Sequence, residues 1–217
     1  MKEQLQKDFD NTIKNLTLSQ RDIEIKKFYL DNFINKGFPN KREEDWKFSD
    51  LNQIIKKNIG ELSFYSDYTS TNKVDTSAFV DGLEHNKIVF INGRIEKIDF
   101  DYEKKDQIEI IDQSETINKF NNNSSLSDLN SAFTNKSFKI VVKKGYQLIK
   151  PLIIYHTTNS KIWSKNINLR LNFELYENSS LRLIDLFRDT SQKNFLNIFY
   201  NFDLKENSIL KNYKVDK

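Results

Sequence analysis

The side chains with the widest chemical repertoire in this sequence are two histidines and a scatter of carboxylates. His85 and His156 lie far apart, and neither has a carboxylate at the spacing of a helical metal site. No serine stands in a Gly-x-Ser-x-Gly motif, so a serine hydrolase of that type is not indicated. We expect both histidines to be ordinary loop or strand-end residues, and we assign no catalytic residue.

The sequence also lacks the motifs of common cofactors. It contains neither a Gly-x-x-x-x-Gly-Lys-Ser/Thr phosphate loop nor a Gly-x-Gly-x-x-Gly dinucleotide fingerprint. With Cys 0, it has no disulfide, no Cys-ligated zinc site and no thiolate of its own for an iron–sulfur cluster. We therefore assign no cofactor-binding residue and no metal ligand to this chain.

One group of acidic residues suggests an enzymatic alternative. Asp185 lies within the apolar run 181–187, with Asp189, Glu174 and Glu177 nearby in the sequence. A pair of such carboxylates on a β-solenoid is typical of glycosidases. A strand-end acid that faces solvent explains Asp185 equally well.

Charge and hydropathy exclude several classes of protein. Lys+Arg 34 against Asp+Glu 31 gives a net charge of +3, which does not favour a nucleic-acid partner. Basic pairs such as Lys56-Lys57, Lys104-Lys105 and Lys143-Lys144 are expected to be solvated. No stretch approaches the roughly 18 apolar residues of a membrane span, and residues 1–8 do not resemble a signal peptide. We expect a cytoplasmic protein with no membrane partner.

The first third of the chain has helical periodicity. Apolar residues predict one helix over about 5–16 and a second that starts at Ser19 and stops at Gly37. A shorter third helix is predicted over about 49–58. Residues 1–85 then form an N-terminal helical region with a linker.

The middle of the chain, residues 86–136, is predicted to be a small strand-turn-strand unit with a connecting helix. Asn92-Gly93 between two apolar runs is the strongest hairpin signal, because both turn positions accept positive φ. A short strand is expected over 108–111, and Ser127 is expected to cap a helix that reaches Phe133.

Residues 137–217 alternate between apolar and polar side chains, which predicts β-strands. Leu148, Leu181 and Leu210 each follow a polar turn and recur about every 30 residues. This period favours stacked β coils of a solenoid, whose inner faces are buried only against their neighbours. An antiparallel sandwich is the structural alternative.

The most distinctive segment, residues 37–51, combines a helix stop, a charged turn and an aromatic anchor. Trp46 and Phe48 have large apolar areas to bury, and Arg42 is able to fork onto a carboxylate. We interpret the segment as a structural clamp between the helices and the β region.

This segment resembles the signature of the SufD proteins, within the SufB/SufD family of iron–sulfur cluster assembly proteins. The matching residues are Pro39, Arg42, Glu43, Trp46, Lys47 and Phe48. Further resemblances follow in the same order along the chain, at 88–94, Leu129-Asn130-Ser131-Ala132-Phe133, Lys144-Gly145 with Lys150-Pro151-Leu152, and 177–181.

The resemblance implies an α+β fold, with an N-terminal helical region followed by a right-handed parallel β-helix that begins near Ser137. It also implies a non-catalytic scaffold of the SUF system, which pairs with a SufB-like subunit and a SufC-like ATPase. An iron–sulfur cluster would be held only transiently, at the level of the complex. Family members are about twice as long, so we expect a fragment or a product truncated at its C-terminal end.

Two other functions remain open from the sequence. One is a carbohydrate-binding or carbohydrate-active β-solenoid protein, which would use surface carboxylates and aromatic side chains. The other is a general interaction domain with no role in cluster assembly. Binding of glycans would favour the first of these, and co-purification with SufB-like and SufC-like chains would favour the SUF scaffold.

Overall fold

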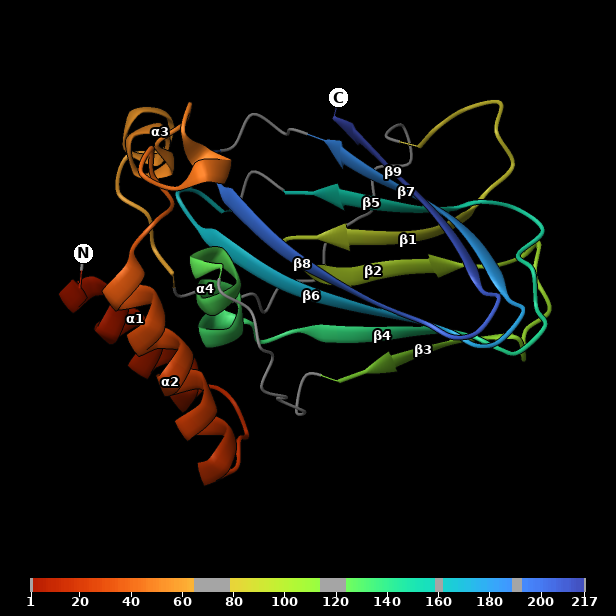
Figure 1. Cartoon of the computed structure of the whole chain (residues 1–217), viewed down its shortest axis with the longest axis horizontal. Helices are drawn as coiled ribbons and strands as arrows, with labels where there is room; N and C mark the ends of the chain where they lie inside the picture. Colours follow the sequence, from red (N-terminus) through yellow and green to blue (C-terminus); the bar gives the residue numbers. More distant parts are fainter. Residues whose placement is uncertain (1, 65–78, 114–123, 159–161, 189–192, 217) are drawn as a thin grey trace.

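The computed structural model describes residues 2–64, 79–113, 124–158, 162–188 and 193–216. Within these ranges the chain forms four α-helices, one short 3-10 helix and nine β-strands in two sheets. Helices α1 and α2 lie to one side of the strands, and α4 lies between them and the strands (Figure 1). None of the described helices combines the length and the apolar character needed to cross a membrane.

The N-terminal helices follow the predicted pattern. Helix α1 spans Lys2–Lys14, α2 spans Gln20–Lys36, and α3 spans Leu51–Asn58. Ser19 caps α2 as predicted, because its hydroxyl accepts a hydrogen bond from the Asp22 amide at 3.2 Å. Gly37 follows α2 with φ +73°, a conformation that L side chains rarely adopt. The cap of α3 is Asp50, one residue beyond the predicted start.

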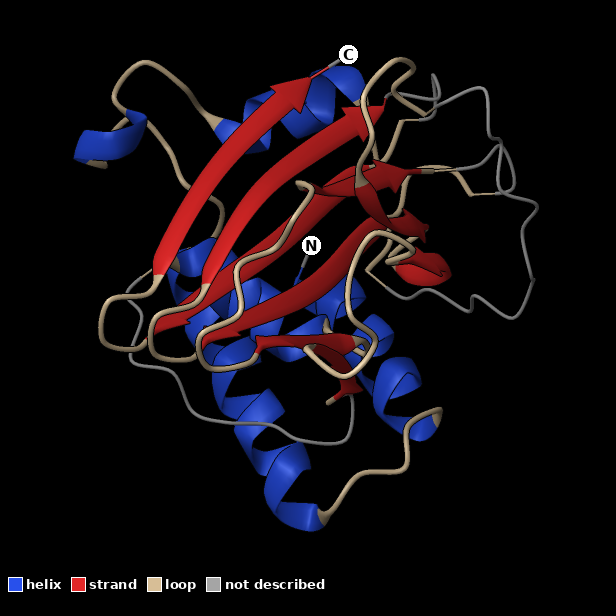
Figure 2. Ribbon diagram, turned by 90° about the vertical axis from the view of Figure 1, so that its right-hand side faces the viewer, coloured by secondary structure: helices blue, strands red, loops and turns tan. Residues whose placement is uncertain are grey.

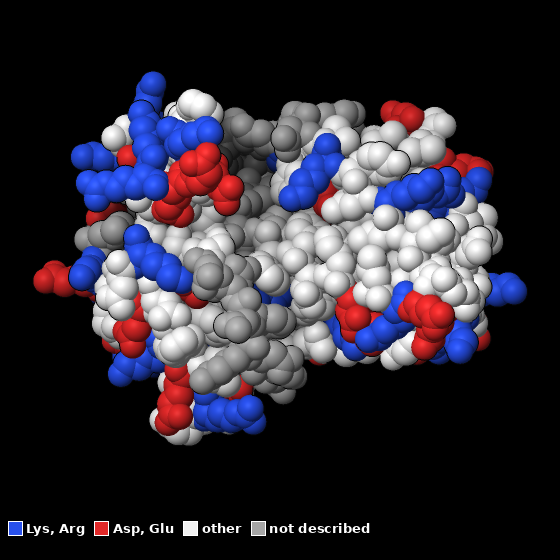
Figure 3. Space-filling view, in the orientation of Figure 1, with Lys and Arg blue, Asp and Glu red and all other residues white. Residues whose placement is uncertain are grey.

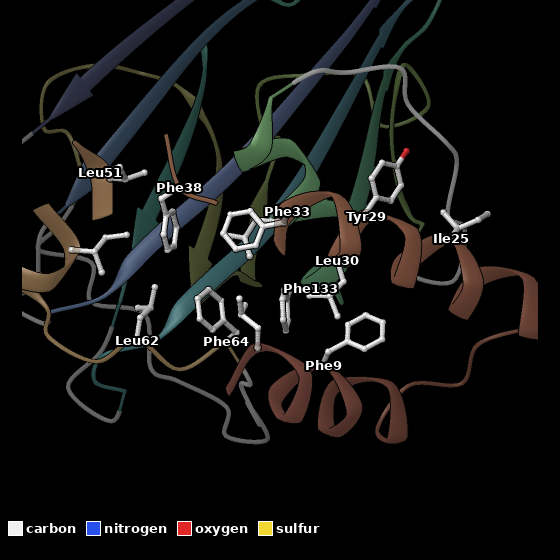
Figure 4. Close-up of a cluster of buried hydrophobic side chains, with 14 residues drawn as sticks. Phe9, Ile25, Tyr29, Leu30, Phe33, Phe38, Leu51, Leu62, Phe64 and Phe133 are labelled. Atoms are coloured by element: carbon white, nitrogen blue, oxygen red, sulfur yellow. The ribbon is translucent and has the colours of Figure 1, made fainter. Parts of the chain in front are cut away.

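These helices share an apolar core with α4, which spans Ser125–Phe133. Phenylalanine rings dominate the core, and several meet edge to face (Figure 4). Its most buried members come from α1, α2, α4 and the segment between α3 and the sheets: Leu5, Phe9, Leu30, Phe33, Phe64, Leu129 and Ala132. The helices are thus fixed to the sheets by burial rather than by the connecting loops.

The strands form one five-stranded and one four-stranded sheet. The first has the order β2-β1-β5-β7-β9 and the second β3-β4-β6-β8. The strands are β1 (Asn86–Ile91), β2 (Arg94–Asp99), β3 (Ile108–Asp112), β4 (Ser137–Val142), β5 (Leu152–Thr157), β6 (Asn166–Leu175), β7 (Ser180–Arg188), β8 (Phe195–Leu204) and β9 (Ile209–Asp216). Neighbouring strands are parallel except in the pairs β1–β2 and β3–β4.

The predicted fold class, an N-terminal helical region followed by a right-handed parallel β-helix, is wrong. The described residues form a mixed α/β fold with two parallel-dominated sheets and four α-helices. Each sheet ends in an antiparallel strand, β2 or β3, and α4 is inserted between β3 and β4 in the chain. Alternation and a repeat of about 30 residues specify strands and their inward faces, but not how the strands are grouped into sheets.

The register predicted for the repeats is confirmed at its last step. Leu181 lies opposite Leu210 in the parallel pair β7–β9. The amide of Leu148 donates to the carbonyl oxygen of Ser180 at 3.0 Å, which brings the first repeat beside the second. Asparagines take positive φ in the turns, as Asn178 with φ 59° and Asn207 with φ 56° illustrate. Asparagine thus occupies turn positions for which glycine is the usual choice.

A second apolar core lies between the two sheets. It combines inward side chains of β1, β5 and β7 with those of β4 and β6, and Ile88, Leu152, Leu171 and Leu183 are fully buried. Viewed from the side, the strands curve past one another, with helices behind and below them and a short helical segment at the upper left (Figure 2). This core sets which side chains of each strand face inward and which face outward.

Candidate functional site

The signature segment lies on the surface. A 3-10 helix, Glu44–Trp46, forms its centre, and Arg42 is exposed. Trp46 is half-buried and packs against the helical core, whereas Phe48 is 86% exposed. The expectation that both aromatic rings bury large areas is therefore wrong for Phe48. Only Trp46 has the packing that a clamp requires.

The motif Leu129-Asn130-Ser131-Ala132-Phe133 lies on α4, where the helices meet the sheets. The Asn130 side-chain amide donates to the carbonyl oxygens of Leu169 at 3.1 Å and Asn197 at 2.7 Å. Its oxygen accepts a hydrogen bond from the Thr134 hydroxyl at 2.9 Å. Asn130 is fully buried, so one side chain connects α4 to both β6 and β8.

A buried lysine contacts the C-terminal end of the same helix. Lys26 Nζ donates to the carbonyl oxygens of Ser131, Ala132 and Thr134 at 3.4, 3.3 and 2.5 Å. These carbonyls lie at the negative end of the α4 dipole, which favours a cation. Burial, together with the nearby Arg170 guanidinium, lowers the pKa of Lys26 to about 7.

The two histidines have different surroundings. His85 Nδ1 lies 2.6 Å from the Leu83 carbonyl oxygen, and its Nε2 lies 2.8 Å from the Tyr155 hydroxyl. The Tyr155 oxygen also accepts a hydrogen bond from the Val80 amide at 3.0 Å. These contacts occupy both ring nitrogens, and His85 lies directly before the first residue of β1.

His156 belongs to a buried polar cluster that the sequence analysis missed. Its Nε2 lies 2.9 Å from the Tyr200 hydroxyl oxygen and 3.4 Å from Asp185 Oδ1. The Tyr200 hydroxyl donates a hydrogen bond to the same Asp185 oxygen. Asp185 is 0% exposed and His156 is 2% exposed, so the prediction of a solvent-facing strand-end acid at Asp185 is wrong.

Burial dominates the titration of this cluster. It lowers the pKa of His156 below its ordinary value, although Asp185 acts in the opposite direction. Burial also raises the pKa of Tyr200 far above its ordinary value, and the neighbouring Asp185 carboxylate adds to this effect. At neutral pH His156 and Tyr200 are therefore both uncharged.

The position of Asp185 in the sheet explains how the cluster forms. Ile154 and Asp185 are register partners in β5–β7, and Asp185 and Lys214 are partners in β7–β9. A carboxylate thus takes a place at which the preceding strand has an apolar residue. The signal in the sequence is an acid on the inward side of the alternation Leu181, Leu183, Asp185.

A shallow groove of about 550 Å³ lies on the opposite face of the second sheet. Glu174 forms an ion pair with Lys139 there, and Lys143 Nζ lies 2.8 Å from Glu109 Oε1. The structure therefore separates Glu174 from Asp185, which lies between the sheets. Glu174 and Asp185 therefore do not form a carboxylate pair of the glycosidase type, and Asp189 lies outside the described residues.

Strands β8 and β9, consecutive in the chain, are the last strands of their respective sheets. Their large apolar side chains are unusually exposed: Leu204 46%, Ile209 56%, Tyr213 56% and Val215 37%. Uncharged atoms cover the centre of the face on which β6 and β8 run, and charged side chains gather at its margins (Figure 3). This pair of edges therefore presents several exposed apolar side chains close to the C-terminal end of the described chain.

Comparisons with known proteins add no identification. No protein-family model and no curated protein matches this chain. In the part of the chain that the structure describes, no group of three or more histidine and acidic side chains is placed to hold a metal ion.

Proposed function

We propose that this chain is a non-catalytic scaffold subunit of the SUF iron–sulfur cluster assembly complex, acting in the cytoplasm. It would pair with a SufB-like subunit and a SufC-like ATPase. The ordered motifs from Pro39 to Leu181 support this assignment. This ordered set of motifs is the observation that carries it, and the edge strands β8 and β9 are the surface at which we place the contact.

A sheet edge presents a row of backbone donors and acceptors, and an added strand satisfies them. On β9, the exposed side chains of Ile209 and Tyr213 would contribute apolar area to such a contact. On β8, the side chains are half-buried along most of the strand and exposed only at its end. A partner that covers both edges would therefore bury backbone and apolar surface together.

The proposed division of chemistry follows from the sequence. With Cys 0, this subunit would leave thiolate ligation of the cluster to its SufB-like partner. Without a phosphate loop, it would leave ATP hydrolysis to the SufC-like partner. Its own part is to hold a rigid edge in place for the partner subunit.

The test is co-expression of the tagged chain with the SufB-like and SufC-like proteins of the same organism. The wild-type chain is expected to retain the SufB-like subunit through size-exclusion chromatography. Tyr213→Lys is expected to weaken this association by at least about tenfold, because it places a charge against an apolar contact.

Ile98→Lys is the matched control, since Ile98 is 47% exposed and lies on β2, the opposite edge of the same sheet. It is expected to leave the association unchanged. The proposal is refuted if the wild-type chain recovers neither partner. Equal loss in both variants would refute the assignment of the contact to the β8–β9 edges.

A further inference from the structure

We propose that His156, Asp185 and Tyr200 form a binding site for a divalent transition-metal ion between the two sheets. The proposal is independent of the scaffold role, because it rests on side chains of β5, β7 and β8 and needs no partner chain. The metal would bind through His156 Nε2, Asp185 Oδ1 and the Tyr200 oxygen.

The three donor atoms already converge. The distances from His156 Nε2 to the Tyr200 oxygen and to Asp185 Oδ1 are 2.9 and 3.4 Å. Bonds of about 2.0–2.2 Å to a tetrahedral metal place neighbouring donors roughly 3.3–3.6 Å apart. The His156–Asp185 distance already lies in this range, and the two contacts of the Tyr200 oxygen have to open for the three donors to share one ion.

The second argument is the charge on Asp185. Its carboxylate is 0% exposed, and Oδ2 has no hydrogen-bond partner among the described residues. Its one ion-pair partner within 4.0 Å in the described chain is His156, at 3.4 Å. A buried carboxylate oxygen without a partner is costly, and a cation at this position would offset that cost.

Lys214 is the competing source of positive charge. It is the register neighbour of Asp185 on β9, but its Nζ lies over the Tyr200 ring, 5.5 Å from the centroid. Lys214 is also exposed, so solvent competes for its ammonium group. Replacing Lys214 therefore distinguishes a bound metal ion from the Lys214 ammonium group as the charge that compensates the Asp185 carboxylate.

Stacking fixes the orientation of the imidazole. The His156 ring lies between Phe90 and Phe187, with centroid distances of 5.5 and 4.8 Å and interplanar angles of 12° and 17°. Nε2 is thereby directed at the other two donors. A ligand held in this way loses little conformational freedom on binding a metal.

The donor set defines the class of metal. One imidazole nitrogen and two oxygens suit Zn²⁺ or Co²⁺ better than Ca²⁺ or Mg²⁺, which take six or more oxygen ligands. On binding, the neutral imidazole carries its hydrogen on Nδ1, and the Tyr200 hydroxyl releases its proton to solvent. The charges of the carboxylate, the phenolate and the divalent ion then sum to zero, which suits a buried site.

The test uses the full chain, with Co²⁺ as a visible probe and Zn²⁺ in equilibrium dialysis. We expect one ion per chain, visible absorption from low-coordinate Co²⁺, and release of one proton. Asp185→Asn and Tyr200→Phe keep their side-chain volumes and are each expected to weaken binding at least tenfold. Tyr155→Phe is the matched control, because it alters the other tyrosine–histidine pair, which has no carboxylate.

Three outcomes would overturn the proposal. The first is no Co²⁺ absorption by the wild-type chain under conditions in which its circular dichroism is that of a folded protein. The second is equal binding by wild type, Asp185→Asn and Tyr200→Phe, which would place the ion elsewhere. The third is an absence of binding in wild type together with an unfolding temperature lowered by Lys214→Met, which would identify Lys214 as the cation that neutralises Asp185.

Discussion

Replacing Asn130 by leucine should destabilise the connection between the helices and the sheets more than any change of equal size on the surface. The side chain is fully buried, and leucine has nearly the same volume, so no cavity is expected. The change removes two donors to backbone carbonyl oxygens and one acceptor of the Thr134 hydroxyl. At about 1 kcal/mol for each hydrogen bond, the free energy of unfolding should fall by about 3 kcal/mol.

The measurement is urea denaturation followed by circular dichroism. With an m-value of about 2 kcal/mol/M, the midpoint should fall by roughly 1.5 M urea. Asn58→Leu is the matched control, since Asn58 also donates from a helix to a backbone carbonyl oxygen, at 3.0 Å, but is exposed. Its effect should stay within about 0.5 kcal/mol. Equal midpoints for wild type and Asn130→Leu would refute the reasoning that Asn130 holds α4 against β6 and β8.

Three further predictions concern stability. The pKa of Lys26 is about 7 in the folded chain and about 10.5 in the unfolded chain, so between these pH values only the unfolded chain keeps the proton. The free energy of unfolding should therefore rise with pH across this interval. The gain in stability is at most about 5 kcal/mol, because the carbonyl acceptors favour the ammonium form of Lys26. Lys26→Met should remove the rise of the urea midpoint with pH. Gly93→Ala should cost about 1–3 kcal/mol in the same assay, because the new Cβ would lie 2.9 Å from Ile167 Cγ2 at φ +77°; an unchanged midpoint would contradict that close approach. Trp46→Ala should cost about 1–2 kcal/mol and Phe48→Ala less than about 0.5 kcal/mol in thermal unfolding, and the reverse order would mean that Phe48 is the anchor.

The two aromatic residues of the signature segment have different surroundings in the fold. The backbone closes the segment into a loop between α2 and α3, because the Leu51 amide donates to the Pro39 carbonyl oxygen at 3.1 Å. Trp46 anchors the segment from one side, and Phe48 projects from it. Trp46 therefore contributes to the stability of the fold, whereas Phe48 is exposed and able to contact another molecule.

The absence of a matching family model leaves the SUF assignment dependent on the ordered motifs and on the β8–β9 edges. The metal site depends on different residues, on the inner faces of β5, β7 and β8. The two proposals are therefore tested by different readouts, association with a partner and binding of Co²⁺ or Zn²⁺. Failure of one leaves the other standing.

Local structure was predictable from the sequence because its causes lie within a few residues. The apolar period defined α1 and α2, Ser19 and Gly37 marked the ends of α2, and Asn92-Gly93 identified the hairpin. The register of Leu181 with Leu210 was also predictable, because a strand buried on one face tolerates no slip by a single residue.

Only the tertiary structure decided which strands share a sheet and which polar side chains meet in the interior. Strand β1 pairs with β5 across 60 intervening residues, from Ile91 to Leu152, and no local pattern specifies that choice. The same long-range packing brings His156, Asp185 and Tyr200 together from three strands. The alternation of apolar and polar residues predicts that a side chain faces inward. Which side chains it meets across the core depends on the relative position of the two sheets.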